Sequence, residues 1–198
     1  MLDYEKKFEG KIIAGIDEAG RGPLAGPVVC ACVIMPLDDE CIIEGIDDSK
    51  KLSEKKRDQL EILIKERAIA YSVVEIDEKI IDEINILNAT KLGMKKALEN
   101  LKIKPDIVLI DAVKIDTAIV QENIIKGDAL SYNIASASIL AKVHRDRLMK
   151  QLDLKYPEYQ FAKHKGYGTK AHIESLKKYG KCPIHRGSFI KKILNSPF

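Results

Sequence analysis

The chain has 198 residues, of which 45% are hydrophobic and 32% are charged, and its formal net charge is +3. This length predicts one domain or slightly more with a buried core, and the composition excludes disordered, collagen-like and repetitive proteins. The longest apolar runs, such as residues 27–35, are far shorter than the roughly 18 residues that span a bilayer, and acidic residues interrupt any signal sequence, so we expect a cytoplasmic protein without membrane contact.

The first half of the chain predicts two neighbouring strands, a capped helix and a third strand. Residues 11–17 form an apolar strand that ends at Asp17 and Glu18, residues 20–27 form a loop rich in Gly and Pro, and residues 28–35 form the second strand. Ser53 is an N-cap for a helix that continues to about residue 67, and residues 69–76 are the third strand. Residues 77–101 have helical spacing, with a break near residues 85–88.

The second half predicts a strand over residues 107–111, a weaker strand over 119–126 and a long helix over 133–152. Residues 157–169 are expected to be a loop, and Thr169 caps a short helix that Gly180 ends. The alternation predicts a single α/β domain over residues 1–198, with a catalytic core to about residue 155 and a helical substrate-binding extension from about residue 156.

Acidic residues stand where the predicted strands end. Asp17 and Glu18 follow one apolar strand, Asp111 follows another, and Asp128 lies between the weak strand and the long helix. In a small sheet such positions can converge, and crowded carboxylates suit Mg²⁺ or Mn²⁺, two of which about 3.5–4 Å apart can clamp a phosphodiester. A single acid after a strand is more often a turn former or a helix cap, so the spacing alone leaves both interpretations open.

Two other phosphate-binding motifs fail at the same loop. Residues 15–22 approach the pattern GxxxxGK[ST], but Arg21 replaces the lysine, Gly22 replaces the hydroxyl residue, and two carboxylates stand inside the loop. A third glycine is missing for the dinucleotide fingerprint. The glycines instead indicate a backbone that comes close to a sugar or a phosphate.

Six motifs along the chain resemble, in the right order, those of the type 2 ribonucleases H, and specifically ribonuclease HII. They are GIDEAGRGPLAGPV at residues 15–28, DSKKLS at 48–53, LID at 109–111, DAL at 128–130 with the helix ASASILAKVHRD at 135–146, HKGYGT at 164–169 and HRGSF at 185–189. The related ribonuclease HIII type usually carries an extra N-terminal domain and a polar residue in place of Arg21, so we expect the HII type.

The resemblance implies a ribonuclease H-like fold with a mixed five-stranded sheet flanked by helices. It also implies that two divalent ions, Mg²⁺ or Mn²⁺, are held by the four acids. These catalytic and metal-binding residues are Asp17, Glu18, Asp111 and Asp128. Substrate contacts are implied for Gly20, Arg21 and Gly22, whose backbone is expected to read a ribose 2′-hydroxyl, and for Tyr167 on the deoxyribose side of an RNA-to-DNA junction.

Further residues carry weaker expectations. Lys50, Lys51, Lys142 and Lys165 are expected to contact backbone phosphates, although each alone could be a solvated charge. Asp146 lies one helical turn after Lys142, so an ion pair is a simpler role for it than metal binding. For His164 we expect a structural or phosphate-contacting role.

The expected activity is endonucleolytic hydrolysis of the RNA strand of RNA–DNA hybrids and incision 5′ to ribonucleotides embedded in duplex DNA, leaving 3′-hydroxyl and 5′-phosphate ends. We expect a monomer, and residues 190–198 are too short and generic to predict contact with a sliding clamp. Two alternatives stay open: a nuclease of the same broad fold that cleaves DNA alone, and a hybrid-binding protein without activity.

Overall fold

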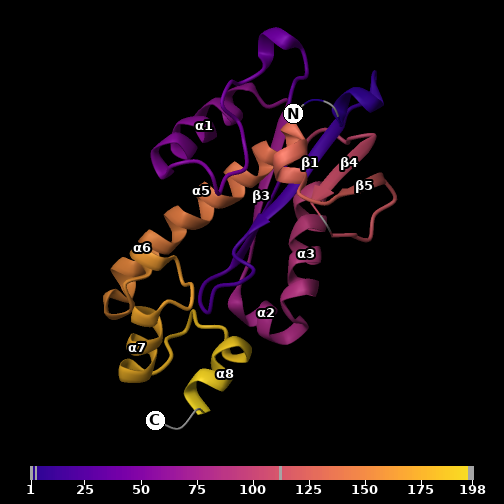
Figure 1. The fold of residues 1–198 in the computed structure, drawn as a ribbon. Coiled ribbons are helices and arrows are strands. Elements are labelled where there is room, and N and C mark those ends of the chain that lie inside the picture. The colour runs from indigo at the N-terminus through magenta and orange to yellow at the C-terminus, as the bar shows by residue number, and fades with distance from the viewer. Residues whose placement is uncertain (1, 3, 112, 196–198) are drawn as a thin grey trace.

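A mixed five-stranded sheet forms the centre of the computed structural model, which describes residues 2, 4–111 and 113–195 (Figure 1). The strands are β1 Ile13–Ala19, β2 Val28–Ile34, β3 Ala70–Ile76, β4 Ile107–Asp111 and β5 Val120–Ile124. Their order is β3-β2-β1-β4-β5. β1 pairs antiparallel with β2 and parallel with β4, so β1 joins an antiparallel half of the sheet to a parallel half.

Helices surround this sheet and extend beyond it. They are α1 Glu54–Arg67, α2 Glu78–Ile84, α3 Ile86–Glu99, α4 Gly127–Leu130, α5 Tyr132–Lys155, α6 Phe161–His164, α7 Lys170–Tyr179 and α8 Gly187–Asn195, with 3₁₀ helices at Glu5–Phe8, Asp39–Cys41 and Pro157–Tyr159. Within the described residues, no helix combines the length and the apolar composition that crossing a membrane would need.

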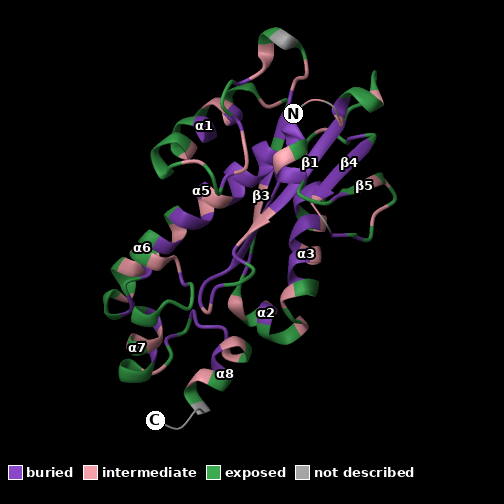
Figure 2. Cartoon of the chain, viewed as in Figure 1, coloured by how far each residue is buried: buried purple, intermediate pink, exposed green. Residues whose placement is uncertain are grey.

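The sheet separates two apolar layers. Both faces of β2 are buried, and alternate residues of a strand point to opposite faces. Val29, Ala31 and Val33 accordingly pack with residues of α1 and α5, whereas Cys30 and Cys32 pack with residues of α3. Figure 2 shows the buried strands between these helices, and the more exposed lower half of α5 that leads to the C-terminal helices.

Gly15 brings β1 and α5 into close contact. A Cβ atom at this position would lie 2.2 Å from the backbone carbon of Asn133, so only glycine lets the start of α5 lie directly against the strand. The side chain of Glu5 holds the same end of α5, where its Oε1 accepts hydrogen bonds from Ser131 Oγ (2.6 Å) and Asn133 N (3.1 Å). The first turns of α5 are therefore fixed above β1, where the acidic strand end lies.

Most elements predicted from the sequence are present. Ser53 and Thr169 cap α1 and α7 as expected, accepting hydrogen bonds from Lys56 N and His172 N. The predicted break in residues 77–101 occurs at Asn85, which has φ +67° and separates α2 from α3. Cys30, Cys32, Cys41 and Cys182 are free thiols.

The expected loop over residues 157–169 was partly wrong, because it contains a 3₁₀ helix and α6. α6 has only four residues, and it is bounded by Gln160 and Lys165, both with positive φ. Glutamine and lysine rarely adopt the left-handed conformation, so the sequence does not indicate where this helix begins and ends. Asp128 lies within the short helix α4 and not in a plain connection, and α8 was not predicted as a separate helix.

Candidate active site

A cavity of about 230 Å³ opens where β1 and β4 end. Its lining comes from five separate parts of the chain: Asp17, Glu18, Ala19, Gly20, Arg21, Gly22, Ser49, Lys50, Asp111, Ser138, Lys142, Arg145 and Tyr167. Nine of the residues singled out from the sequence are in this group. A larger hollow of about 450 Å³ beside α3 contains no such group of strand-end acids.

The parallel pairing of β1 with β4 brings Asp17 and Asp111 to neighbouring strand ends. The last paired residues are Ile16 and Ile110, and the next residue on each strand is the acid. Neighbouring strands lie about 4.8 Å apart, so the side chains of Asp17 and Asp111 are close enough to share a site for two metal ions. The sheet topology, and not the sequence spacing, is what joins these residues across more than ninety positions.

Asp17 is buried at the end of β1. Its Oδ1 accepts a hydrogen bond from Glu18 N at 2.8 Å, and the Ser138 hydroxyl of α5 also bonds to this carboxyl. Burial, and then repulsion from Glu18, raises the pKa of Asp17 well above its usual value. Ser138 is in turn bonded to Ser49 (Oγ to Oγ, 2.8 Å), so hydroxyls of α5 and of the loop before α1 support the site.

Glu18 and Asp111 are perturbed in the same direction. Burial is the main cause of the raised pKa of Glu18, against which the Arg21 guanidinium acts at 3.4 Å. Burial also raises the pKa of Asp111, which accepts a hydrogen bond from Gly127 N at 3.2 Å and is repelled by Asp128. Three carboxyls are therefore held together where negative charge is unfavourable, and a bound cation would relieve this.

Asp128 lies beside the cavity and not in its lining. It is buried in α4, and its Oδ2 lies 3.0 Å from Lys50 Nζ. This hydrogen bond is the main cause of the raised pKa of Lys50, whose side chain is otherwise largely exposed. Lys50 thus links the loop before α1 to the acid of α4.

The donor set fits a hard divalent cation. Among the described residues, no three His, Cys, Asp or Glu side chains are grouped closely enough to ligate one ion as they stand. Glu18 and Asp128 contact the cations Arg21 and Lys50, while Asp111 accepts from a backbone N–H. The carboxylate oxygens of these acids are the ligands that Mg²⁺ and Mn²⁺ prefer.

The loop over residues 20–27 between β1 and β2, called the glycine loop below, contributes Gly20, Arg21 and Gly22 to the cavity wall. Gly20 has φ +97°, and a Cβ atom there would lie 2.0 Å from Arg145 Nε, so its requirement for glycine comes from the fold. At Gly22 a Cβ atom would meet only Tyr167 Cε1 at 3.7 Å, an ordinary contact. The Tyr167 side chain is 45% exposed at the cavity, which leaves its ring free to contact a ligand.

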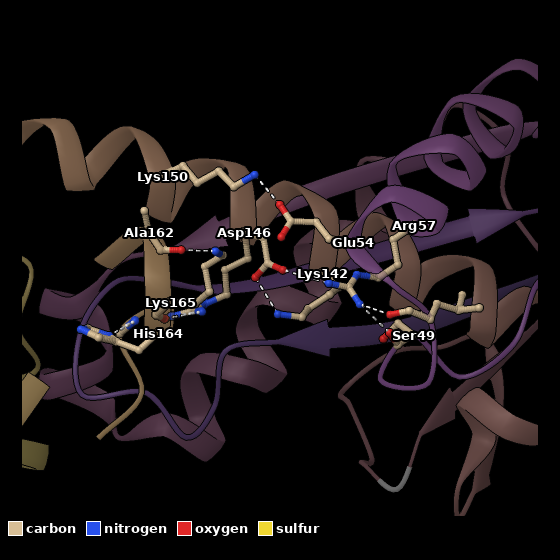
Figure 3. Close-up of polar contacts among 12 residues, drawn as sticks. Ser49, Glu54, Arg57, Lys142, Asp146, Lys150, Ala162, His164 and Lys165 are labelled. Atoms are coloured by element: carbon tan, nitrogen blue, oxygen red, sulfur yellow. Dashed lines mark hydrogen bonds and ion pairs between the residues drawn. The ribbon is translucent and has the colours of Figure 1, made fainter. Parts of the chain in front are cut away.

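The remaining sequence-predicted residues lie outside the cavity lining. Figure 3 shows Asp146 between Lys142 and Arg57, with oxygen-to-nitrogen distances of 2.6 and 3.4 Å, so the expected local ion pair is confirmed. Lys51 Nζ contacts Asp47 Oδ1 at 3.2 Å, and Lys165 Nζ bonds to the Ala162 carbonyl. The structure does not bring these side chains to the carboxylates, with the exception of Lys142, which lines the cavity.

A histidine chain lies behind the loop that carries Tyr167. The Tyr167 carbonyl is 2.9 Å from His172 Nδ1, which must therefore carry a hydrogen, and His172 Nε2 is 3.0 Å from His185 Nε2. His185 Nδ1 accepts from Cys182 N at 2.9 Å. Burial is the main cause that lowers the pKa of His185, to about 4, and it also lowers the pKa of His172. The rings of His172 and His185 are therefore neutral near pH 7. His164 stacks on His172 (4.5 Å between ring centres), a structural position.

Sequence reasoning missed Ser49, Ser138 and two buried arginines, Arg145 and Arg186. All four lie within motifs quoted above, but a serine in a helix or an arginine in a basic segment gives no signal of burial. Their roles depend on which chain segments the fold brings together.

Known proteins resemble this chain in sequence and in structure. The model of the family described as Ribonuclease HII matches residues 14–192. A protein of Caldicellulosiruptor bescii named Ribonuclease HII is 63% identical over 199 residues, covering 98% of this chain and 95% of its own length. Two solved structures are similar: ribonuclease H2 from Pyrococcus horikoshii (29% identity, TM-score 0.75, 92% and 96% of the two chains) and the PCNA:RNase HII complex from Archaeoglobus fulgidus (27%, 0.78, 94% and 98%).

Proposed function

This chain belongs to the ribonuclease HII family, a family of metal-dependent hydrolases that act on RNA in RNA–DNA hybrids, and on that premise we propose that it also incises duplex DNA 5′ to a single embedded ribonucleotide. The cut would leave a 3′-hydroxyl and a 5′-phosphate. One observation supports the proposal above others: three strand-end acids share a small cavity with a glycine loop and an exposed tyrosine.

The carboxylates have the role of holding cations at the scissile phosphate. Asp17, Glu18 and Asp111 would be the principal ligands, with Asp128 released from Lys50 as a fourth. Two Mg²⁺ or Mn²⁺ ions, when bound, supply an activated water and stabilise the leaving oxygen. Water then forms the new bond to phosphorus, and the bond from phosphorus to the 3′-oxygen breaks, so the upstream strand gains the proton.

Selection of RNA is assigned to the loop of Gly20, Arg21 and Gly22. The 2′-hydroxyl distinguishes a ribonucleotide from a deoxyribonucleotide, and a backbone without side chains at Gly20 and Gly22 allows a sugar to approach closely. Tyr167 lies next to Gly22 and would pack against the neighbouring deoxyribose. Lys50 and Lys142 would contact phosphates, since both line the cavity and carry positive charge.

The direct test uses a DNA duplex with one internal ribonucleotide, incubated with Mg²⁺ or Mn²⁺. We expect incision on the 5′ side of the ribonucleotide, and a rate for Asp17→Asn that is lower by on the order of 1,000-fold. Asp116→Asn is the matched control, because Asp116 is an exposed acid paired with Lys95. Failure of the wild-type chain to cut this duplex, with cutting of a hybrid retained, would reject the single-ribonucleotide activity.

The same assay separates the two rival functions. A nuclease of DNA alone would cut the matching all-DNA duplex at a similar rate, because it needs no 2′-hydroxyl. A binding protein without activity would bind the hybrid but would not cut it with Mg²⁺ or with Mn²⁺. We further propose a cytoplasmic monomer. The Archaeoglobus fulgidus relative was solved in complex with PCNA, which makes a clamp contact worth testing in a binding assay.

A further inference from the structure

Two arginines are buried behind the glycine loop, and their hydrogen bonds go to backbone carbonyls. Arg186, directly before α8, is fully buried. Its guanidinium donates from Nε to the Gly26 carbonyl (2.9 Å), from Nη1 to that of Arg21 (2.9 Å) and from Nη2 to that of Gly20 (2.6 Å). One side chain of the C-terminal extension thus holds the glycine loop at three points.

Arg145 of α5 holds the remainder of the same loop. It donates from Nε to the Pro27 carbonyl (3.0 Å), from Nη2 to that of Ala25 (3.1 Å) and from Nη1 to that of Lys165 (2.9 Å). The last bond connects the loop to the segment that carries Tyr167. The two guanidiniums therefore hold both the glycine loop and the segment that carries Tyr167.

Burying these two positively charged side chains next to each other lowers the stability of the fold. Burial is the main cause that lowers the pKa of Arg145 to about 10 and that of Arg186 to about 9, and Arg145 also repels Arg186. Both side chains still carry their charge at neutral pH. Their hydrogen-bond acceptors are neutral carbonyls, so the two like charges are buried without the full compensation that a carboxylate gives.

The orientation of the peptide groups shows what the guanidiniums achieve. In a trans peptide the C=O and the following N–H point in opposite directions. The Gly20 and Arg21 carbonyls point at Arg186, so the N–H groups of Arg21 and Gly22 point away from it. Gly20, Arg21 and Gly22 line the cavity, whereas Arg186, which receives the carbonyls, is not part of that lining.

We propose that Arg186, with Arg145 beside it, is a positioning residue for ribose selection: it turns the Gly20 and Arg21 carbonyls inward so that the Arg21 and Gly22 N–H groups face the 2′-hydroxyl and adjoining phosphate of a ribonucleotide. The proposal rests on the proposed function of the same cavity. It also gives the two buried charges a use, because positive charge behind two N–H donors strengthens their attraction for oxygen atoms of the substrate.

The test compares Arg186→Lys with the wild-type chain in binding and in cleavage. Lysine keeps the charge, but its single ammonium cannot reproduce a planar fork that serves three carbonyls. Affinity is measured in EDTA by fluorescence anisotropy, for a duplex with one ribonucleotide and for the all-DNA duplex of the same sequence. We expect the variant to lose a ribonucleotide preference of about 10-fold, the equivalent of one or two hydrogen bonds, with little change in affinity for all-DNA duplex.

Cleavage provides the second readout. At saturating substrate we expect the Arg186→Lys rate to fall on the order of 100-fold, the effect of a misplaced contact. Arg147→Lys is the control, because Arg147 is a half-exposed arginine of α5 that pairs with Glu61 (2.8 Å) and not with the loop. A merely structural role for Arg186 would weaken binding of both duplexes alike, and that result would overturn the proposal.

A measurement on the wild-type chain decides the matter if Arg186→Lys does not fold. In EDTA, the amide resonances of Arg21 and Gly22 should shift on addition of the ribonucleotide duplex and shift less with all-DNA duplex. Equal shifts would contradict the proposal. A wild-type chain that neither prefers nor cuts the ribonucleotide duplex would instead reject the proposed function, so the two failures are distinguishable.

Discussion

Alanine at Gly20 should lower the stability of the protein, whereas alanine at Gly22 should lower its activity, although the two glycines are two residues apart in one loop. Gly20 has φ +97°, where a residue with a side chain costs about 1–3 kcal/mol. Its Cβ atom would also lie 2.0 Å from Arg145 Nε, which must then leave the Pro27 carbonyl. A buried hydrogen bond lost in this way costs about 1–3 kcal/mol more.

Gly20→Ala should therefore lower the free energy of unfolding by about 2–6 kcal/mol, from the sum of these two effects. For a chain of this size each kcal/mol lowers Tm by about 2–4 °C, so the expected fall is roughly 10 °C. At Gly22 the Cβ atom has an ordinary contact at 3.7 Å with Tyr167, and we expect a stability change within about 0.5 kcal/mol.

Gly22→Ala should lose activity although it keeps its stability. Gly22→Ala stays folded, but its methyl group stands where a ribose must approach, so incision at a single ribonucleotide should fall on the order of 100-fold. Thermal unfolding followed by circular dichroism gives Tm, and the duplex assay gives the rate. Equal losses of Tm in the two variants, or full activity in Gly22→Ala, would refute this account of the loop.

Three further predictions test other parts of the site. Asp17→Asn, which should cut on the order of 1,000-fold more slowly, should also raise Tm in EDTA by a few degrees. The reason is that it removes a buried charge whose pKa is raised but keeps an acceptor for Glu18 N, and a lower Tm would count against that cause. Lys50→Met should raise KM and reduce the salt dependence of binding by about one counterion, with kcat little changed, as a titration in KCl can measure. The folded-state pKa of His185, about 4, lies below its unfolded value of 6.5, so its contribution to stability is complete above pH 6.5 and is lost as the pH falls toward 4. At 1.36 kcal/mol per pH unit the loss is at most about 3 kcal/mol, and urea unfolding of His185→Asn should be less dependent on pH over this window.

The fold could be predicted well where a local pattern carries the information. The buried strands, the Ser53 and Thr169 caps and the break before α3 all follow from hydrophobic spacing and capping chemistry. α6 could not be predicted in the same way, because Lys165 adopts a positive φ that its side chain does not favour. Such a conformation is imposed by surrounding contacts, among them the hydrogen bond from Arg145 to the Lys165 carbonyl.

The candidate site was likewise predicted only in part from the sequence. The acids stood out because they end apolar strands, but only the pairing of β1 with β4 brings Asp17 beside Asp111. The hydroxyl of Ser138 and the guanidinium of Arg186 gave no sequence signal, since their role depends on partners far away in the chain, such as the Gly20 carbonyl. Spacing in a sequence identifies reactive groups more readily than it identifies the groups that hold them.

We propose that acids from β1, β4 and α4 act together on divalent cations beside the glycine loop. Anomalous diffraction from a crystal soaked in Mn²⁺ tests this most directly, because it locates the metal without reference to activity. We predict two Mn²⁺ peaks about 3.5–4 Å apart, both in the cavity and in contact with carboxylates of Asp17 and Asp111. Manganese bound only elsewhere, or bound equally in a crystal of Asp17→Asn, would contradict the account.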